Sequence, residues 1–156
     1  MSVTLFDALR IGPYTLKNRV LMAPLTRMRA GQPGDVPTAL MAEYYRQRAS
    51  AGLVITEATQ ISPEGKGYAD TPGLYNAAQT EGWKQCTAAV HAEGGLICMQ
   101  LWHVGRVSHT SLQIDGQAPV SASDKPYENR TTIKDANGNL IRAACSTPRA
   151  LRTDEI

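Results

Sequence analysis

The stretch "LICMQLWHVGR" (residues 96–106) changes character half-way along its length. Residues 96–102 are predicted to form a strand, whose first residues are apolar, as in a strand buried on both faces, and the last residues of the stretch are polar and aromatic. Gly94 and Gly95 precede it and predict the end of a helix. A buried strand that follows a helix and ends in polar residues indicates an α/β sheet, in which functional residues gather at the carboxyl ends of the strands.

Two similar apolar runs come earlier in the chain. "RVLMAPL" (residues 19–25) and "LVITEA" (residues 53–58) are predicted to be strands. Between the predicted strands, helices are expected over residues 38–50 and from Asn76 onward, with Asn76 and Gln79 as a capping pair. The strand–helix–strand–helix–strand order, with strands apolar on both faces, predicts a parallel sheet covered by helices.

The helix signals also predict which residues face the core. We expect Asp35 to cap the first helix and Pro37 to lie in its first turn. The residues predicted to point inward are Leu40, Met41, Tyr44 and Tyr45 from the first helix and Trp83, Cys86 and Val90 from the second.

The alternation of strand and helix signals ends after Trp102. Asn137-Gly138 stands between two short β-prone runs and predicts a hairpin, and Thr153 in "RTDEI" predicts the N-cap of a further helix. We therefore expect about three βα units with a β-hairpin insertion, the last unit without its helix. Three parallel strands leave open edges. The sequence thus predicts that residues 1–156 are the N-terminal part of a single domain, completed by residues outside this chain.

Composition excludes several classes of function. The 156 residues carry a net charge of +2 and no long basic run, so we expect no nucleic-acid partner. No apolar stretch approaches the roughly 20 residues of a membrane span, and the first residues do not resemble a secretory signal. Cys86, Cys98 and Cys145 are too widely spaced for a zinc site or a disulfide framework, which favours a reduced, cytoplasmic protein.

Polar and aromatic residues follow the three predicted strands. They are Thr26, Glu57, Thr59, Gln100, Trp102 and His103. Gln100 lies in an apolar strand, where a buried amide needs hydrogen-bond partners, so we expect it to have a role. On the residues alone, Thr26 is equally consistent with a turn hydroxyl, Trp102 with a core residue and Tyr68 with a surface ring. The histidines are too scattered to indicate a metal site.

Several motifs together resemble one family. "NRVLMAPLTR", "AEYYRQRASAGLVITEAT", "GYADTPGLY", "QLWHVGR" and "TPRALRTDEI" are similar to the old yellow enzyme family of flavin-dependent ene reductases, in particular its bacterial N-ethylmaleimide reductase and pentaerythritol tetranitrate reductase group. The resemblance covers essentially the whole chain. It implies an eightfold (β/α) TIM barrel that holds FMN at its mouth, of which this chain is the N-terminal portion.

The resemblance also implies cofactor-binding residues. Pro24, Leu25 and Thr26 border the flavin, and the Thr26 hydroxyl donates to the flavin C4 carbonyl and tunes the flavin. Ala58 presents its backbone to the flavin edge. The Gln100 amide pairs with the pyrimidine end of the ring system, whose edge alternates donors and acceptors.

The resemblance also implies that the substrate is lined by Tyr68, Trp102 and Arg142. Thr26 and Trp102 place the chain in the classical branch of the family. The family's substrate-binding His-His or His-Asn pair, its proton-donating tyrosine and most contacts to the FMN phosphate lie after the fourth strand, outside these 156 residues.

The implied function is that of an NAD(P)H-dependent flavin oxidoreductase. Such an enzyme reduces the C=C bond of α,β-unsaturated carbonyl or nitro compounds. We expect this chain to be inactive alone and to require a complementary C-terminal barrel polypeptide or a second copy. Two alternatives stay open: a non-catalytic half-barrel that oligomerises as a structural or binding protein, and a relative of the iron–sulfur flavoprotein reductases.

Overall fold

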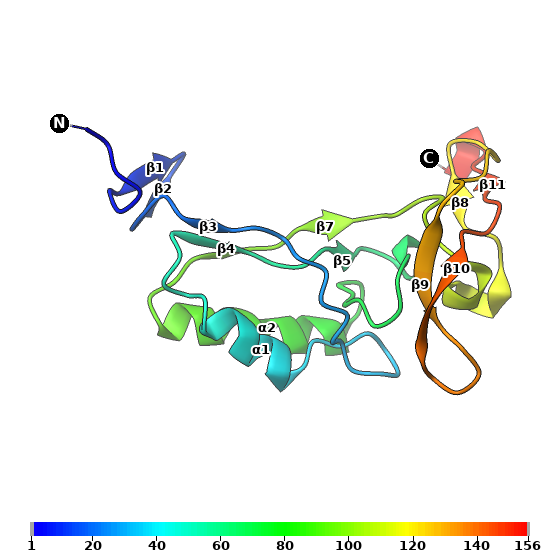
Figure 1. Cartoon of the computed structure of the whole chain (residues 1–156), viewed down its shortest axis with the longest axis horizontal. Helices are drawn as coiled ribbons and strands as arrows, with labels where there is room; N and C mark the ends of the chain where they lie inside the picture. The colour runs from blue at the N-terminus through cyan, green and yellow to red at the C-terminus, as the bar shows by residue number, and fades with distance from the viewer. Residues whose placement is uncertain (1, 156) are drawn as a thin grey trace.

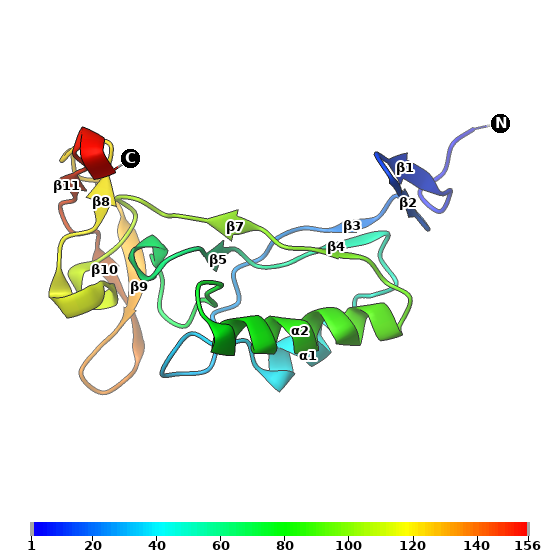
Figure 2. The ribbon, with the colours of Figure 1, turned by 180° about the vertical axis from the view of Figure 1, so that it is seen from behind.

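The computed structural model describes residues 2–155. The molecule is elongated, with a small sheet and two helices in the middle and a β-hairpin at either end (Figure 1). The view from behind shows the same arrangement, with β1 and β2 at one end and β9 and β10 at the other (Figure 2). Among these residues, no helix combines the length and the apolar character needed to cross a membrane.

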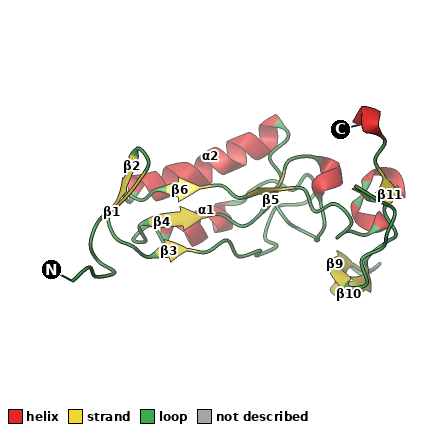
Figure 3. Cartoon of the chain, turned by 90° about the horizontal axis from the view of Figure 1, so that it is seen from above, coloured by secondary structure: helices red, strands yellow, loops and turns green. Residues whose placement is uncertain are grey.

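The central sheet has three parallel strands in the order β3-β4-β6. These are β3 (Leu21–Met22), β4 (Leu53–Ile55) and β6 (Ile97–Cys98), which lie side by side in Figure 3. Further along the same chain directions, β5 (Thr59–Gln60) pairs in parallel with β7 (Leu101–Trp102).

The regular strands are shorter than the predicted runs 19–25, 53–58 and 96–102. The ladder is interrupted between β4 and β5, although the Thr56 amide still donates to the Cys98 carbonyl at 2.9 Å and the Thr59 amide to the Gln100 carbonyl at 2.9 Å. The interruption separates the apolar starts of the strands from their polar ends. The side chains that follow the central sheet are therefore set on irregular backbone.

Helices α1 (Ala39–Arg46) and α2 (Ala77–Ala92) cover one face of the sheet (Figure 3). The Asn76 side chain accepts a hydrogen bond from the Gln79 amide at 2.9 Å, so the predicted capping pair is confirmed. The predicted cap of α1 is wrong. Thr38 caps this helix through the Met41 amide, which also leaves Pro37 before the first turn, and Asp35 is buried in a polar network instead.

The core lies between the helices and the sheet. Its buried residues are Ala30, Met41, Tyr45, Ala49, Val54, Trp83, Cys86 and Val90. The inward orientation predicted for the residues of α2 is confirmed. In α1 the prediction is wrong for Leu40, which is 63% exposed, and Tyr44 is only half-buried. The opposite face of the sheet is not covered by residues 2–155, so Leu21 and Leu101 are exposed and the expectation of strands buried on both faces is not met.

The remaining elements lie at the two ends. β1 (Leu9–Ile11) and β2 (Tyr14–Leu16) form one antiparallel hairpin, and β9 (Arg130–Lys134) and β10 (Leu140–Ala144) form another. The predicted Asn137-Gly138 turn connects β9 and β10, and Gly138 has a positive φ of 82°, which glycine tolerates.

The short elements complete the chain. β8 (Val120–Ser121) pairs in parallel with β11 (Arg149–Ala150). Single 3-10 turns occur at Pro63–Gly65, Thr110–Leu112, Ile114–Gly116 and Thr153–Glu155. The last turn occupies the position where a helix start was predicted at Thr153, and Ile156 lies outside the described residues.

Candidate functional site

Three neighbouring segments bring the predicted cofactor residues to one edge of the sheet. Thr26, Ala58 and Gln100 follow β3, β4 and β6, and the carboxyl ends of parallel strands meet at the same edge. Two hydrogen bonds connect the three segments at this edge. The Arg27 amide donates to Oε2 of Glu57 at 3.0 Å, and the Thr59 amide donates to the Gln100 carbonyl at 2.9 Å.

Thr26, Ala58 and Gln100 carry polar groups at this edge that form no hydrogen bond within residues 2–155. Thr26 and Gln100 are exposed, and neither side chain has a hydrogen-bond partner within residues 2–155. Ala58 is 3% exposed, and its backbone N–H and C=O have no partner in that range either. A hydroxyl, an amide and an unpaired peptide group at one edge suit a planar ligand whose rim alternates donors and acceptors. These residues therefore fit the edge of a flavin.

The burial predicted for Gln100 is wrong. Gln100 lies in the break between β6 and β7 and its side chain is exposed, because the helices cover only one face of the sheet. Its backbone is nevertheless held, since its amide donates to Oγ1 of Thr56 at 3.2 Å. Pro24 and Leu25 continue from β3 toward Thr26, with Pro24 half-buried and Leu25 53% exposed.

Tyr68 and Trp102 form an aromatic pair beside this edge. Their ring centroids are 5.6 Å apart and the rings are 18° from parallel. The indole Nε1 of Trp102 is buried without a hydrogen-bond partner in the described part of the chain. Tyr68 is therefore not an isolated surface ring, and half-buried Trp102 does not belong to the core between the helices and the sheet.

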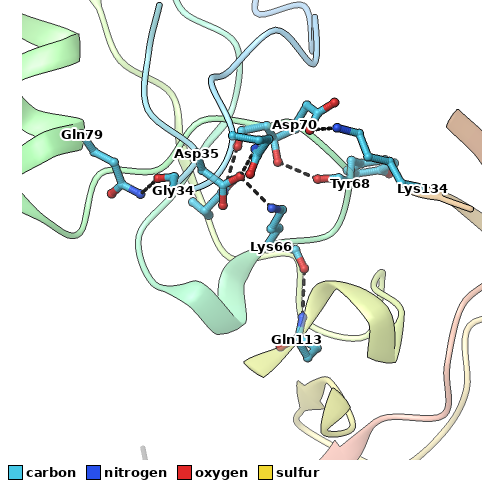
Figure 4. A network of polar contacts seen from close by, with 11 residues as sticks. Gly34, Asp35, Lys66, Tyr68, Asp70, Gln79, Gln113 and Lys134 are labelled. Atoms are coloured by element: carbon cyan, nitrogen blue, oxygen red, sulfur yellow. Dashed lines mark hydrogen bonds and ion pairs between the residues drawn. The ribbon is translucent and has the colours of Figure 1, made fainter. Parts of the chain in front are cut away.

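A polar network holds the loop that carries Tyr68 (Figure 4). Nζ of Lys66 lies 2.7 Å from the carboxylate of buried Asp35, and the Lys66 carbonyl accepts a hydrogen bond from Nε2 of Gln113 at 3.0 Å. On the other side of Tyr68, Asp70 pairs with Nζ of Lys134 at 2.7 Å. These contacts join residues more than thirty positions apart, so no local sequence pattern indicates them.

Arg142 lies in the hairpin that borders this loop. The Ala69 amide donates to the Thr132 carbonyl at 2.9 Å, and Thr132 is the register partner of Arg142. The guanidinium of Arg142 bonds within its own hairpin, with Nη2 2.6 Å from the Arg130 carbonyl. The structure thus connects the hairpin of Arg142 to the loop that carries Tyr68, while the hydrogen bonds of Arg142 itself stay within the hairpin.

Glu57 has a structural role that the sequence alone does not reveal. It is 1% exposed, and its Oε2 accepts hydrogen bonds from the amides of Arg27 and Met28 at 3.0 and 3.3 Å. Burial raises the pKa of the Glu57 carboxyl above its ordinary value, and the two amide hydrogen bonds partly oppose this increase. The sequence feature that could have indicated this role is an acidic residue at the end of an apolar run. A carboxyl buried at such a position requires hydrogen-bond partners.

The described residues contain no group of three or more His, Cys, Asp or Glu that could hold a metal ion. His103 and His109 instead accept hydrogen bonds from nearby amides, of Gly105 and Ser111 respectively. The site consists of hydrogen-bonding groups and an aromatic pair.

Comparison with known proteins identifies related chains. Residues 4–156 match the sequence model of the NADH:flavin oxidoreductase / NADH oxidase family. Putative 12-oxophytodienoate reductase 2 of Oryza sativa subsp. japonica is 47% identical over 156 residues, which are 99% of this chain and 39% of that protein. Flavin oxidoreductase hxnT of Emericella nidulans is 45% identical, over 97% of this chain and 38% of that protein.

Two solved structures are also similar. Morphinone reductase in complex with tetrahydroNAD superimposes with a TM-score of 0.93 at 52% identity, covering 99% of this chain and 42% of that chain. The old yellow enzyme homologue from Zymomonas mobilis superimposes with a TM-score of 0.86 at 47% identity, covering 98% and 41%. The chain therefore spans about two fifths of the length of these relatives.

Proposed function

Because the chain belongs to the NADH:flavin oxidoreductase / NADH oxidase family, whose members use FMN and a nicotinamide, we propose that it is part of an NAD(P)H-driven reductase of activated alkenes. Its fold is the N-terminal portion of a TIM barrel. The proposed substrates are α,β-unsaturated carbonyl or nitro compounds, and the remaining barrel is required for activity. A complementary C-terminal polypeptide is the proposed partner.

One observation carries this proposal. Thr26, Ala58 and Gln100 follow three adjacent parallel strands and offer, at the same edge, hydrogen-bonding groups that have no partner within residues 2–155. When bound there, FMN supplies the hydride transfer from the nicotinamide to the alkene. The chain's own residues bind and orient: Thr26 donates through its hydroxyl, Ala58 through its backbone, and Gln100 through its amide.

The aromatic pair has a separate part in the proposal. The stacked rings of Tyr68 and Trp102 form an aromatic wall that limits water beside the flavin edge. Arg142 is the third proposed substrate-side residue.

No observation favours the non-catalytic half-barrel or the iron–sulfur relative. The proposal is tested by the flavin absorbance of this chain assembled with the C-terminal part of the barrel. An assembly that retains no flavin would contradict the proposal.

Replacing Gln100 by Leu should weaken the retention of FMN. The substitution leaves polar groups of the flavin unpaired, which costs on the order of 1–3 kcal/mol in binding free energy. The dissociation constant of FMN, measured by fluorescence titration of the assembled protein, should therefore rise by roughly 5- to 150-fold. Gln85→Leu, at an exposed position of α2, is the matched control and should leave the constant unchanged. Equal affinities of parent and Gln100→Leu would show that Gln100 is only a strand residue.

Replacing Thr26 by Ala should lower the reduction potential of the flavin. The hydroxyl bond strengthens as the flavin gains negative charge and is worth roughly 1.5–3 kcal/mol in the reduced state. For a two-electron couple this corresponds to a decrease of about 30–60 mV, measurable by dye-equilibrated reduction. Thr26→Ser keeps the hydroxyl and should retain most of the parent potential. A Thr26→Ala protein with the parent potential would rule out the hydrogen bond.

A further inference from the structure

We propose that Glu57 is a positioning residue, which holds the Thr26 hydroxyl in place by binding the two backbone amides that follow Thr26. The inference rests on the proposed function, because it concerns how the flavin-binding edge is kept in order. Glu57 does not itself need to touch a ligand. Its carboxylate acts on the backbone of the loop, and the loop presents Thr26.

The loop after β3 has few other attachments. Within residues 2–155, no hydrogen bond is made by any backbone or side-chain group of residues 23–26. The first anchors are the amides of Arg27 and Met28, and both bind the same oxygen, Oε2 of Glu57, at 3.0 and 3.3 Å. The next anchors are the Arg29 carbonyl, which accepts a hydrogen bond from the Thr38 hydroxyl at 3.3 Å, and the Ala30 amide, which donates to the Asp70 carbonyl at 3.1 Å. The position of Thr26 therefore depends directly on Glu57.

The loop also has a strained backbone that needs such an anchor. Met28 has a φ of 53°, in the left-handed region that residues other than glycine rarely adopt. A conformation of this kind persists when the surrounding contacts determine it. The two hydrogen bonds to Glu57 come from the peptide groups on either side of Arg27, the second of which leads into Met28, and they stabilise this turn.

Glu57 is held from the other side by fixed groups. Its own amide donates to the Tyr45 hydroxyl at 2.9 Å, and Tyr45 is completely buried in α1. Its carbonyl accepts hydrogen bonds from the hydroxyls of Thr56 and Thr59 at 2.9 and 3.1 Å. Among the described residues, no Lys, Arg or His forms a salt bridge with Glu57. A buried carboxylate that is bonded to a loop backbone rather than to a cation is suited to fixing that loop.

The sign of a change in flavin potential distinguishes positioning from a direct charge effect. A carboxylate near the flavin-binding edge disfavours negative charge on the flavin, so removing the charge alone should raise the potential. Loss of the Thr26 hydrogen bond should lower it. Glu57→Gln removes the charge but keeps an oxygen acceptor for both amides, whereas Glu57→Leu removes both.

The test uses the FMN-loaded assembly of this chain with the C-terminal barrel. We expect the potential of Glu57→Gln to equal or exceed that of the parent, and the potential of Glu57→Leu to fall below that of the parent. In a Thr26→Ala background, Glu57→Leu should cause no further decrease. Equal shifts in the Gln and Leu variants, or the same decrease with and without Thr26, would overturn the positioning role.

Amide hydrogen exchange on the flavin-free assembly of this chain with the C-terminal part of the barrel provides a second measurement. The amides of Arg27 and Met28 should exchange at least about tenfold more slowly than that of Thr26, although Thr26 and Arg27 are both exposed residues. Glu57→Gln should keep this protection and Glu57→Leu should remove it. Equal exchange of the three amides in the parent chain overturns the inference even if Glu57→Leu does not fold. Failure of the assembly to retain FMN would instead contradict the proposed function.

Discussion

Produced alone, the 156-residue chain should retain little FMN and reduce no activated alkene, and production together with the C-terminal part of the barrel should restore both. A closed barrel of this kind has eight strands and typically about 250 residues, whereas this chain has a central sheet of three strands. Within residues 2–155, the uncovered face of that sheet and of the neighbouring β5–β7 pair exposes Leu21 and Leu101. Burying these side chains against further strands should supply the stability that the isolated sheet lacks.

The measurements are the FMN content per chain, from absorbance, and the alkene-dependent oxidation of NAD(P)H. The C-terminal polypeptide produced alone is the control, because FMN retention and alkene reduction should each require both polypeptides. The proposed polypeptide supplies the rest of the barrel, and the junction lies beside the exposed turn Thr153–Glu155, where a chain break is better tolerated than inside the sheet. A monomeric 156-residue protein that carries FMN and reduces alkenes would contradict this expectation.

The sequence predicts the order of elements well because the signals are local. The Asn76 cap, the inward face of α2 and the Asn137-Gly138 turn each depend on a few neighbouring residues. Strand lengths were predicted less well. An apolar run shows where a strand is possible, but the ladder hydrogen bonds that define it depend on partner strands far away in the sequence.

The burial of Gln100 could not be predicted for a related reason. Sequence shows that its neighbours are apolar, whereas exposure depends on what covers each face of the sheet, and residues 2–155 cover only one. The role of Glu57 is similarly hidden, since its partners Arg27 and Met28 are about thirty residues away. Family motifs indicate the residues of the proposed flavin edge, but they do not indicate which side chains hold that edge in place.

Replacing Trp83 by Ala should destabilise the assembly of this chain with the C-terminal part of the barrel by roughly 3–5 kcal/mol, which is a large part of the roughly 5–15 kcal/mol that stabilises a typical native protein. Trp83 is 3% exposed in the middle of α2, and its ring centroid lies 6.0 Å from that of Tyr45. Its indole Nε1 donates to the Gly73 carbonyl at 3.1 Å. The substitution therefore removes packing between α1 and α2 and also leaves a buried carbonyl unpaired.

The other tryptophan is a matched control for this effect. Trp102 is half-buried, and its Nε1 has no partner in residues 2–155, so Trp102→Ala should cost clearly less. Urea unfolding followed by far-UV circular dichroism gives both free energies. Similar losses for the two variants would show that the core is not centred on Trp83. Because Tyr45 packs against Trp83 and holds the Glu57 amide, Trp83→Ala should also weaken the protection of the Arg27 and Met28 amides, which connects the stability of the core to the order of the proposed flavin edge.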